Sequence, residues 1–434
     1  MRTAAVLVAL AAAATHAQAK APGGLEGLDS LYPELDALYL DVHRNPELSG
    51  QEEKTAAKLA DRLRRLGYQV TTGVGGTGVV GVLRNGPGPT VLLRTELDGL
   101  PVEEKTGLPY ASKATATDPA GKTVPVMHAC GHDVHMASWT GAAALLSRAK
   151  DRWRGTVVMV GQPAEETVAG AKAMLADRFL ERFPKPDFSV AVHDSSDLPA
   201  GKVAWIPGYA LANVDSVDVT VFGRGGHGAK PDTTVDPVVI AARTVLSLQT
   251  LVSREKDPLE PAVVTVGSIH GGNKHNIIPD DVHLQITVRS YSPQVRKQLL
   301  DGIARIAKAE AAAASAPREP EIRTSEGASA TFNDPALTRR LGAMLARELG
   351  QENVVEGKPE MVAEDFGEFG KAAGVPSVLL RVGAVEPKKY AAARASGTPL
   401  PSLHSATFAP DREPTIRTGA AVLALSALEL LGKR

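Results

Sequence analysis

The sequence predicts an α/β protein in which a mostly parallel sheet is interrupted by an inserted α+β domain. Stretches with helical periodicity alternate with short apolar runs up to about residue 212, and the alternation resumes after residue 324. Between these positions the predicted order is strand, helix, strand, strand, helix, strand, which is a split βαββαβ unit. A chain of 434 residues is also too long for one ordinary core. We therefore expect two domains.

The first part of the sheet domain is predicted as alternating helices and strands. Residues 28–67 contain two helical stretches, and the second, 51–66, is followed by Gly67. The short apolar runs that follow are typical of strands buried on both faces. Further helices are expected at 136–149 and 169–177, and strands at 78–84, 90–94, 156–161 and 188–192.

The inserted domain and the return to the sheet domain follow from the same patterns. In the insertion, strands are expected at 214–222, 263–269, 282–289 and 319–323, and helices at 235–251 and 293–314. The sheet pattern returns with 337–349, 377–382 and a closing helix at 414–431. The sheet domain thus comprises residues 25–212 and 325–434, and the insertion residues 213–324.

The N-terminus has the features of a secretory signal peptide. Met1 and Arg2 precede an apolar run at 3–14, and Ala17-Gln18-Ala19 forms a small-x-small cleavage site. The apolar run is shorter than the roughly 20 residues that span a bilayer, so no stable membrane anchor is expected. We expect residues 1–19 to be removed and the mature protein to be periplasmic or secreted.

Overall charge and one glycine-rich segment exclude two classes of ligand. A formal net charge of -1 and a pI near 6.9 give no basis for binding nucleic acid. Residues 73–78 are rich in glycine, but they lack the Lys-Ser/Thr ending of a phosphate-binding loop and no helix follows them. We expect a turn between strands there, no nucleotide, and a small-molecule partner.

The densest group of chemically active side chains is the stretch 128–135. It holds the only cysteine and three of the eleven histidines in the sequence. Thiolate and imidazole ligands favour a transition metal over calcium or magnesium. Metal ligation also explains a single cysteine in an exported chain, because an oxidising compartment otherwise favours disulfides.

Further candidate ligands follow short apolar runs. Glu165 and Glu166 come after one predicted strand, His193 comes directly after another, and His404 follows a short apolar stretch. Ligands of open parallel sheets gather at the carboxyl ends of the strands. Taken singly, a cysteine or histidine is usually a core residue, and paired glutamates are favourable charges at a helix start. Together they predict a metal-dependent hydrolase.

Several motifs in this order resemble the M20 metallopeptidases, and within them the amidohydrolase branch of hippurate hydrolases, aminoacylases and indole-acetyl-amino-acid hydrolases. The resemblance runs from about Leu38 to Leu431, and both the order and the spacing of the motifs match. The matching segments are 43–49, 94–101, the Cys130 motif, 162–166, 223–229, 276–280, 363–366 and 403–405.

The resemblance implies a set of metal ligands: Cys130, His132, Glu166, His193 and His404. Five side chains exceed the three expected of one open catalytic zinc, so two divalent ions of zinc, manganese, cobalt or nickel are expected. Two such ions would activate a water molecule and polarise the scissile carbonyl.

The resemblance also implies catalytic roles for residues that do not bind metal. Glu165 would be the general base, which takes a proton from water and returns it to the leaving amine. Asp98 would orient a ligand imidazole, although an Asp before Gly99 is also typical of a turn. His135 is interpreted as supporting structure. Two positions depart from the family: Glu96, where aspartate is usual, and Ala363, where serine is common.

The inserted domain resembles the lid of these enzymes and would contribute further side chains. His227 would stabilise the oxyanion, either within one chain or across a homodimer formed through the lid. Asn276 and Arg289 would hold the carboxylate of the substrate's amino-acid half, although a surface salt bridge is the alternative for Arg289.

The expected activity is hydrolysis of the amide bond of an N-acyl amino acid or a related short peptide. A carboxypeptidase or dipeptidase of the same family would use the same site, and the residues above leave this choice open. A periplasmic protein that only binds metal or ligand is the alternative outside enzymes. Glu165 weighs against it, because a binding protein has no use for a general base beside a metal ligand.

Overall fold

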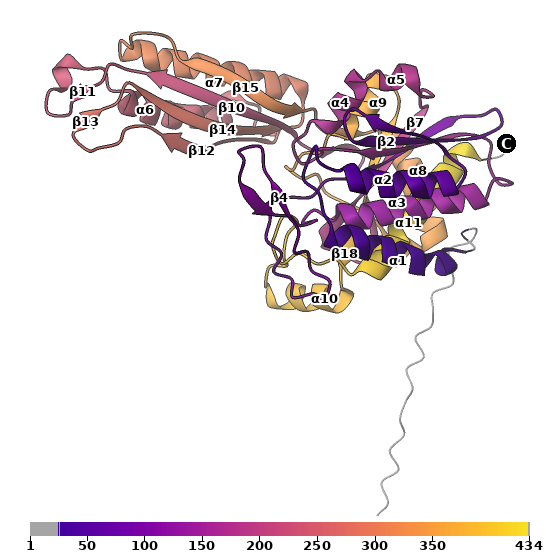
Figure 1. Ribbon diagram of the computed structural model, residues 1–434. Helices are drawn as coiled ribbons and strands as arrows, with labels where there is room; N and C mark the ends of the chain where they lie inside the picture. Colours follow the sequence, from indigo (N-terminus) through magenta and orange to yellow (C-terminus); the bar gives the residue numbers. More distant parts are fainter. Residues whose placement is uncertain (1–24, 26, 433–434) are drawn as a thin grey trace, which may run out of the picture.

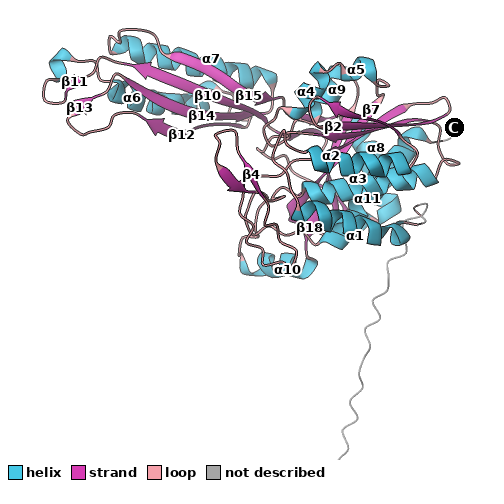
Figure 2. Cartoon of the chain, in the orientation of Figure 1, coloured by secondary structure: helices cyan, strands magenta, loops and turns pink. Residues whose placement is uncertain are grey.

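The computed structural model describes residues 25 and 27–432, which form two lobes (Figure 1). One lobe is an eight-stranded sheet between layers of helices, and the other is a four-stranded sheet with two helices on one face (Figure 2). We call them the sheet domain and the lid. The predicted α/β fold with an inserted α+β domain is confirmed. The predicted signal peptide, residues 1–19, lies outside the described residues.

The strand order in the sheet domain is β1-β2-β6-β3-β7-β18-β8-β17. The four central strands, β6, β3, β7 and β18, are parallel to one another, and antiparallel pairs join them to the strands on either side. The bounds are β1 (Gln69–Val74), β2 (Gly78–Asn85), β3 (Thr90–Glu96), β6 (Gly155–Gln162), β7 (Phe188–Pro199), β8 (Val203–Trp205), β17 (Val354–Glu356) and β18 (Ser377–Val385).

Two helical layers cover the sheet because its strands are apolar on both faces. One face packs against α1 (Leu28–Arg44), α2 (Glu53–Arg65), α3 (His132–Arg148), α8 (Pro335–Leu349) and α11 (Arg412–Leu431). The other face packs against α4 (Gly170–Ala176), α5 (Phe179–Arg182) and α9 (Gly367–Ala373). Among the described residues, only α11 has the length and hydropathy of a membrane span, and 72% of that stretch is buried in this core.

The lid is an antiparallel sheet with the strand order β12-β14-β10-β15. Alternate residues such as Val219, Leu284 and Ile286 face the two lid helices and form a separate core. The bounds are β10 (Asn213–Phe222), β12 (Ala262–His270), β14 (Asp281–Ser290), β15 (Glu321–Ala328), α6 (Pro237–Thr250) with a π-helical turn (Leu251–Glu255), and α7 (Pro293–Ala313).

Most predicted elements are confirmed, with differences at their ends. The sequence predicts that the last lid strand stops at residue 323, but β15 continues to Ala328, where it pairs with Val214 of β10. Similarly, β7 does not end before His193 but continues to Pro199, because β18 pairs with it over that length. The glycine-rich segment forms the predicted turn, between β1 and β2.

Several short elements escape prediction, because pieces of two to four residues carry no periodicity. They include β8, β17 and α5, whose bounds are given above, and also β4 (Thr115–Thr117), β5 (Thr123–Pro125), β9 (Gly208–Leu211), β11 (Gly226–His227), β13 (Ile277–Ile278), β16 (Thr331–Asn333), and 3-10 turns at Pro231–Thr233 and Gln351–Asn353. A longer helix, α10 (Pro387–Ser396), escapes it too; none of its residues is buried, so it has no apolar face.

Candidate metal centre

The candidate site lies at the carboxyl ends of the central parallel strands. Asp98 follows β3, Glu165 and Glu166 follow β6, and His193 lies within β7. His132 is the first residue of α3. Because parallel strands end at the same edge of a sheet, residues that are far apart in sequence come together there.

Gly131 allows the two residues beside it to face the cluster. Its φ angle is 74°, and a Cβ atom at this position would lie 2.5 Å from the Asp194 carboxylate. No side chain fits in that space, and L residues rarely adopt this conformation. The glycine therefore turns the chain so that Cys130 and His132 both reach the site.

Backbone carbonyls orient two of the candidate imidazole ligands. The Nδ1 atom of His132 lies 2.8 Å from the carbonyl oxygen of Asp98, and that of His193 lies 2.8 Å from the carbonyl of Asp194. A carbonyl oxygen only accepts, so each Nδ1 carries a proton, and in the neutral imidazole each Nε2 has the lone pair that can bind a metal. The Asp98 carboxylate is 3.4 Å from His132 Nδ1, so the Asp98 backbone is the nearer orienting group.

The loop that carries Glu165 and Glu166 has an unusual backbone. Ala164 and Val168, on either side of the pair, have φ angles of 49° and 55°. Positive φ is unfavourable for alanine and more so for a β-branched residue, and such strain persists only where the surroundings enforce it. The buried carboxylates of Glu52 and Asp98 provide this restraint.

Glu52 and Asp98 hold this loop through its backbone. Glu52 Oε1 accepts from the backbone N–H of Ala164 at 2.8 Å, and Asp98 Oδ2 accepts from that of Glu166 at 3.0 Å. Both carboxylates are fully buried. The role of Glu52 is not predictable from the sequence, because an acidic residue at a helix start gives no sign that it is buried.

The five predicted ligands meet in one cluster. The His404 Nε2 atom is 3.2 Å from Cys130 Sγ and 3.4 Å from Glu166 Oε2. Cys130 Sγ is also 3.6 Å from His193 Nε2, and His132 Nε2 is 3.9 Å from Glu166 Oε1. Two ligands at about 2.0 to 2.3 Å from one tetrahedral ion are about 3.3 to 3.8 Å apart. The observed spacing therefore suits metal binding.

Two buried atoms in the cluster support the same conclusion. His132 Nε2 and Glu166 Oε1 are buried and have no hydrogen-bond partner. Leaving such atoms unpaired costs about 1 to 3 kcal/mol each, so they need another partner. Both belong to groups of side chains whose ligand atoms all lie within 4.8 Å of one another. The residues present fit divalent metal ions.

Electrostatics in the cluster also favour a cation. Burial raises the pKa of the Cys130 thiol well above its usual value, and the carboxylates of Glu166 and Glu165 raise it further. A thiolate at this position therefore needs a positive ion beside it. Burial also lowers the pKa of His404, which keeps its imidazole neutral and able to bind metal.

Glu165 lies beside the predicted ligands but differs from them in its surroundings. Its Oε2 atom is 3.7 Å from His132 Nε2, and it also lies close to Glu364 and Asp365. Burial, and the neighbouring charges of Glu364 and Glu166, raise the pKa of Glu165 well above its usual value. A carboxylate of raised pKa is a stronger base than an exposed one.

A buried ionic network behind the cluster has no counterpart among the sequence predictions. Arg94, which is fully buried, donates to Glu364 at 2.7 Å and to Asp365 at 3.0 Å, and it also pairs with Glu96. The other Glu96 oxygen is 3.0 Å from His135 Nδ1. The long side chain of Glu96 thus connects Arg94 with His135, and the supporting role of His135 stays a prediction.

A cavity of about 670 Å³ opens beside the cluster. Four of the five predicted ligands line it, together with Glu165, Arg289 at the near end of the lid strand β14, and Ala363. Ala363, where the family has serine, therefore places a methyl group in the cavity wall. The apolar part of the wall includes Val168, Leu211, Val214, Met361, Val362, Leu379 and Leu403.

His227 and Asn276, the other candidate residues of the lid, do not line this cavity. His227 in β11 and Asn276, whose backbone carbonyl accepts from the Gly228 N–H, are both exposed. β11 and β13 lie at the end of the lid that is furthest from the eight-stranded sheet (Figure 1). Asn276 and Arg289 of one chain therefore do not meet, because β14 separates them along its whole length; their joint role in binding the substrate carboxylate stays a prediction.

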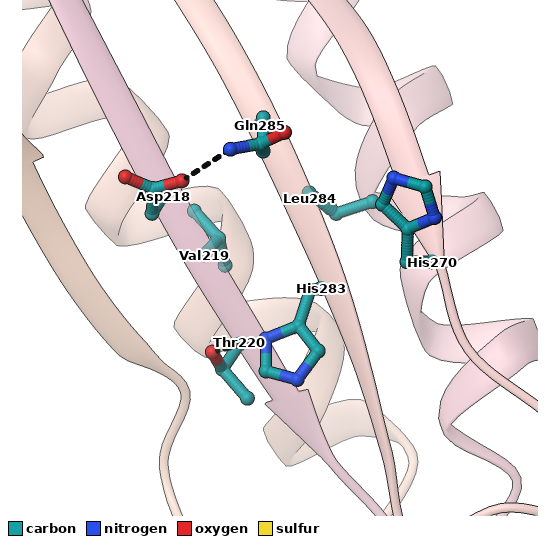
Figure 3. A pocket seen from close by; sticks show the side chains of 7 residues that line it. All are labelled: Asp218, Val219, Thr220, His270, His283, Leu284 and Gln285. Atoms are coloured by element: carbon teal, nitrogen blue, oxygen red, sulfur yellow. Dashed lines mark hydrogen bonds between the residues drawn. The ribbon is translucent and has the colours of Figure 1, made fainter. Parts of the chain in front are cut away.

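A second cavity, of about 310 Å³, lies on the face of the lid sheet that is opposite its helices (Figure 3). Its polar residues are half-buried or exposed and bond to one another: Gln285 donates to Asp218 at 3.2 Å, and His283 Nδ1 lies 3.0 Å from the Thr220 hydroxyl. No polar side chain there is deeply buried, so we assign this cavity no ligand.

Known proteins are similar to this chain along most of its length. Residues 92–407 match the model of peptidase family M20/M25/M40. The thermostable carboxypeptidase 2 of Saccharolobus solfataricus is 36% identical over 396 residues, which cover 90% of this chain and 94% of that protein. The hippurate hydrolase of Campylobacter jejuni is 36% identical over 345 residues, which cover 78% and 85% of the two chains.

A solved structure is similar to this chain as well. It is a dinuclear metal binding peptidase of the M20 family from Bacillus subtilis, with a TM-score of 0.73 and 27% identity. The match covers 93% of this chain and 99% of that one.

Proposed function

The chain belongs to peptidase family M20/M25/M40 and is a metal-dependent amidohydrolase, and we propose that it hydrolyses N-acyl amino acids or short peptides to a carboxylate and a free amino acid. The observation that carries this proposal is the cluster of Cys130, His132, Glu166, His193 and His404 beside Glu165. A cavity of about 670 Å³ next to the cluster has room for a substrate of this size.

The reaction needs both metal ions and a base. The five proposed ligands would hold divalent ions, which would supply an activated water and polarise the amide carbonyl. Glu165, the neighbouring carboxylate, takes the proton from the attacking water and delivers it to the leaving nitrogen. The hydrogen bonds from the loop around Glu165 to Glu52 and Asp98 keep this carboxylate in place during both transfers.

A panel of substrates tests the proposal. Metal-loaded protein should hydrolyse at least one of the N-acetyl, N-benzoyl and N-indoleacetyl amino acids or the dipeptides. A protein that binds two ions but hydrolyses none of them would be a binding protein. The position of Glu165 is the observation against that alternative, because its carboxylate supplies a base beside the proposed ligands, which a binding protein does not need.

Arg289 is proposed to bind the free carboxylate of the substrate's amino-acid half. It lines the cavity, and a guanidinium recognises a carboxylate through paired hydrogen bonds. Arg289→Ala should raise KM about 10- to 100-fold for substrates with a free carboxylate, because a charge-assisted hydrogen bond is lost. Steady-state kinetics on the matching C-terminal amides is the control, and an equal loss on both would indicate a structural role.

We propose that two copies of the chain associate through their lids. The edge strand β12 has no neighbour on one side among the described strands, and apolar side chains are exposed on and near α6, namely Val238, Val239, Leu246 and Leu259. A free strand edge beside exposed apolar surface is typical of a pairing interface. A second copy would also bring His227 and Asn276 to the site of its partner.

The local geometry of His227 suits the proposed role in stabilising an oxyanion. Its Nδ1 atom accepts a hydrogen bond from the Ala229 backbone at 3.0 Å. In the neutral imidazole the proton is therefore on Nε2, which is free to donate to a developing negative charge.

We also propose that the chain is exported and processed. The charged start, apolar run and cleavage site in residues 1–19 support this. N-terminal sequencing of protein recovered from the periplasm or medium should begin at Lys20. Recovery of all the protein from the cytoplasm with Met1 in place would contradict it.

A further inference from the structure

One wall of the substrate cavity contains a buried arginine. Arg381 lies in β18 and pairs in register with His193 of β7. Neighbouring strands are about 4.8 Å apart, and paired residues of parallel strands face the same side of the sheet. The side chain of Arg381 is 13% exposed. A charged group is thus built into the cavity wall directly beside a metal ligand.

Two carboxylates and a hydroxyl surround this guanidinium. Arg381 pairs with Glu360, donates to the Ser195 hydroxyl at 3.1 Å, and lies 3.8 Å from Asp197. The Ser195 hydroxyl also donates to Asp197. Arg381 and Ser195 thus hold both carboxylates at this wall of the cavity.

The charges of this group do not balance. One guanidinium faces two carboxylates, which leaves a net negative charge on this wall of the cavity. Arg381 is mostly buried, whereas the side chains of Glu360 and Asp197 are 34% and 73% exposed. A ligand in the cavity therefore meets carboxylate oxygens at this wall, and they favour a positively charged hydrogen-bond donor.

We propose that Glu360 and Asp197, held by Arg381, bind the α-ammonium group of a substrate whose acyl half is an amino acid. This deepens the proposed function and depends on it, because the ammonium must belong to an amide that the metal centre cleaves. The α-ammonium lies two bonds from the scissile carbonyl carbon, so its binding site must adjoin the metals, as the strand neighbour of His193 does. The enzyme then prefers dipeptides to neutral N-acyl amino acids.

A matched pair of substrates measures this preference. Alanyl-phenylalanine and N-propanoyl-phenylalanine differ only in the ammonium group, so the ratio of their kcat/KM values isolates its contribution. The ratio should exceed one for the metal-loaded wild-type protein. It should fall about tenfold in Glu360→Gln and also fall in Asp197→Asn, because each variant removes one negative charge from the wall.

Two further features keep the test decisive. Glu356→Gln is the matched control, since Glu356 is an exposed carboxylate outside the cavity, and its ratio should equal that of the wild type. Asp197 is largely exposed, so Asp197→Asn should fold even where Glu360→Gln does not, and its ratio alone then decides. A wild-type ratio below one, or a ratio unchanged in Asp197→Asn and in folded Glu360→Gln, overturns the ammonium site. Hydrolysis of neither substrate nor of the wider panel overturns the proposed function itself.

Discussion

Replacing Glu165 with glutamine is expected to lower kcat by about 10² to 10⁴ while the metal content stays that of the wild type. The glutamine side chain cannot act as the base, because a carboxamide does not take up a proton near neutral pH. The five ligands are unchanged in this variant, so the ions should remain bound. Steady-state kinetics together with elemental analysis measures both effects.

The adjacent residue provides the matched control. Glu166→Gln should lose metal, because Glu166 Oε2 lies 3.4 Å from His404 Nε2 and its Oε1 is a buried atom without a partner. The two variants make the same chemical change at neighbouring positions. If Glu165→Gln loses metal and Glu166→Gln retains it, the roles of the two residues are exchanged.

His227→Ala is expected to lower kcat by roughly 10² or more, with metal content and thermal stability retained. The residue is exposed and is not part of the lid core, so the fold does not depend on it. The loss would come from the missing donor to the oxyanion. A fully active His227→Ala enzyme would exclude this residue from the mechanism.

A mixing experiment then tests whether His227 acts on the partner's site. Chains carrying His227→Ala and chains carrying Glu165→Gln are each inactive, but their heterodimer contains one site with both residues intact. After random exchange at equal concentrations, about a quarter of wild-type activity should return, since half the dimers are mixed and each has one working site. If mass spectrometry shows exchange and activity stays absent, the trans arrangement is wrong.

The cluster of candidate metal ligands is predictable because their chemistry is concentrated in the sequence. A cysteine and three histidines within 128–135 are rare by chance, and the other ligands follow apolar runs that form strands. Glu52 and the ion pairs of Arg94 are not predictable, because their partners are 112 and 270 residues away and only the fold brings them together. The proposed ammonium site is not predictable either, because Glu360 and Arg381 lie on separate segments and only the fold brings them together.

The positions of the lid residues relative to one another could not be predicted from the sequence either. Asn276 and Arg289 are 13 positions apart, and their common role is implied only by the resemblance to the family. The antiparallel strand β14 rises about 3.4 Å per residue, which puts its two ends about 30 Å apart. Arg289 therefore reaches the cavity of its own chain, whereas Asn276 lies with His227 at the far end.

The most direct test of the metal centre is to measure metal content and activity on the same samples. Active protein should contain about two divalent ions per chain, and chelation should remove the ions and the activity together. Adding back zinc, manganese, cobalt or nickel should restore both. Full activity in chelated protein that retains less than about 0.1 ion per chain would contradict the assignment of Cys130, His132, Glu166, His193 and His404 as the centre of the reaction.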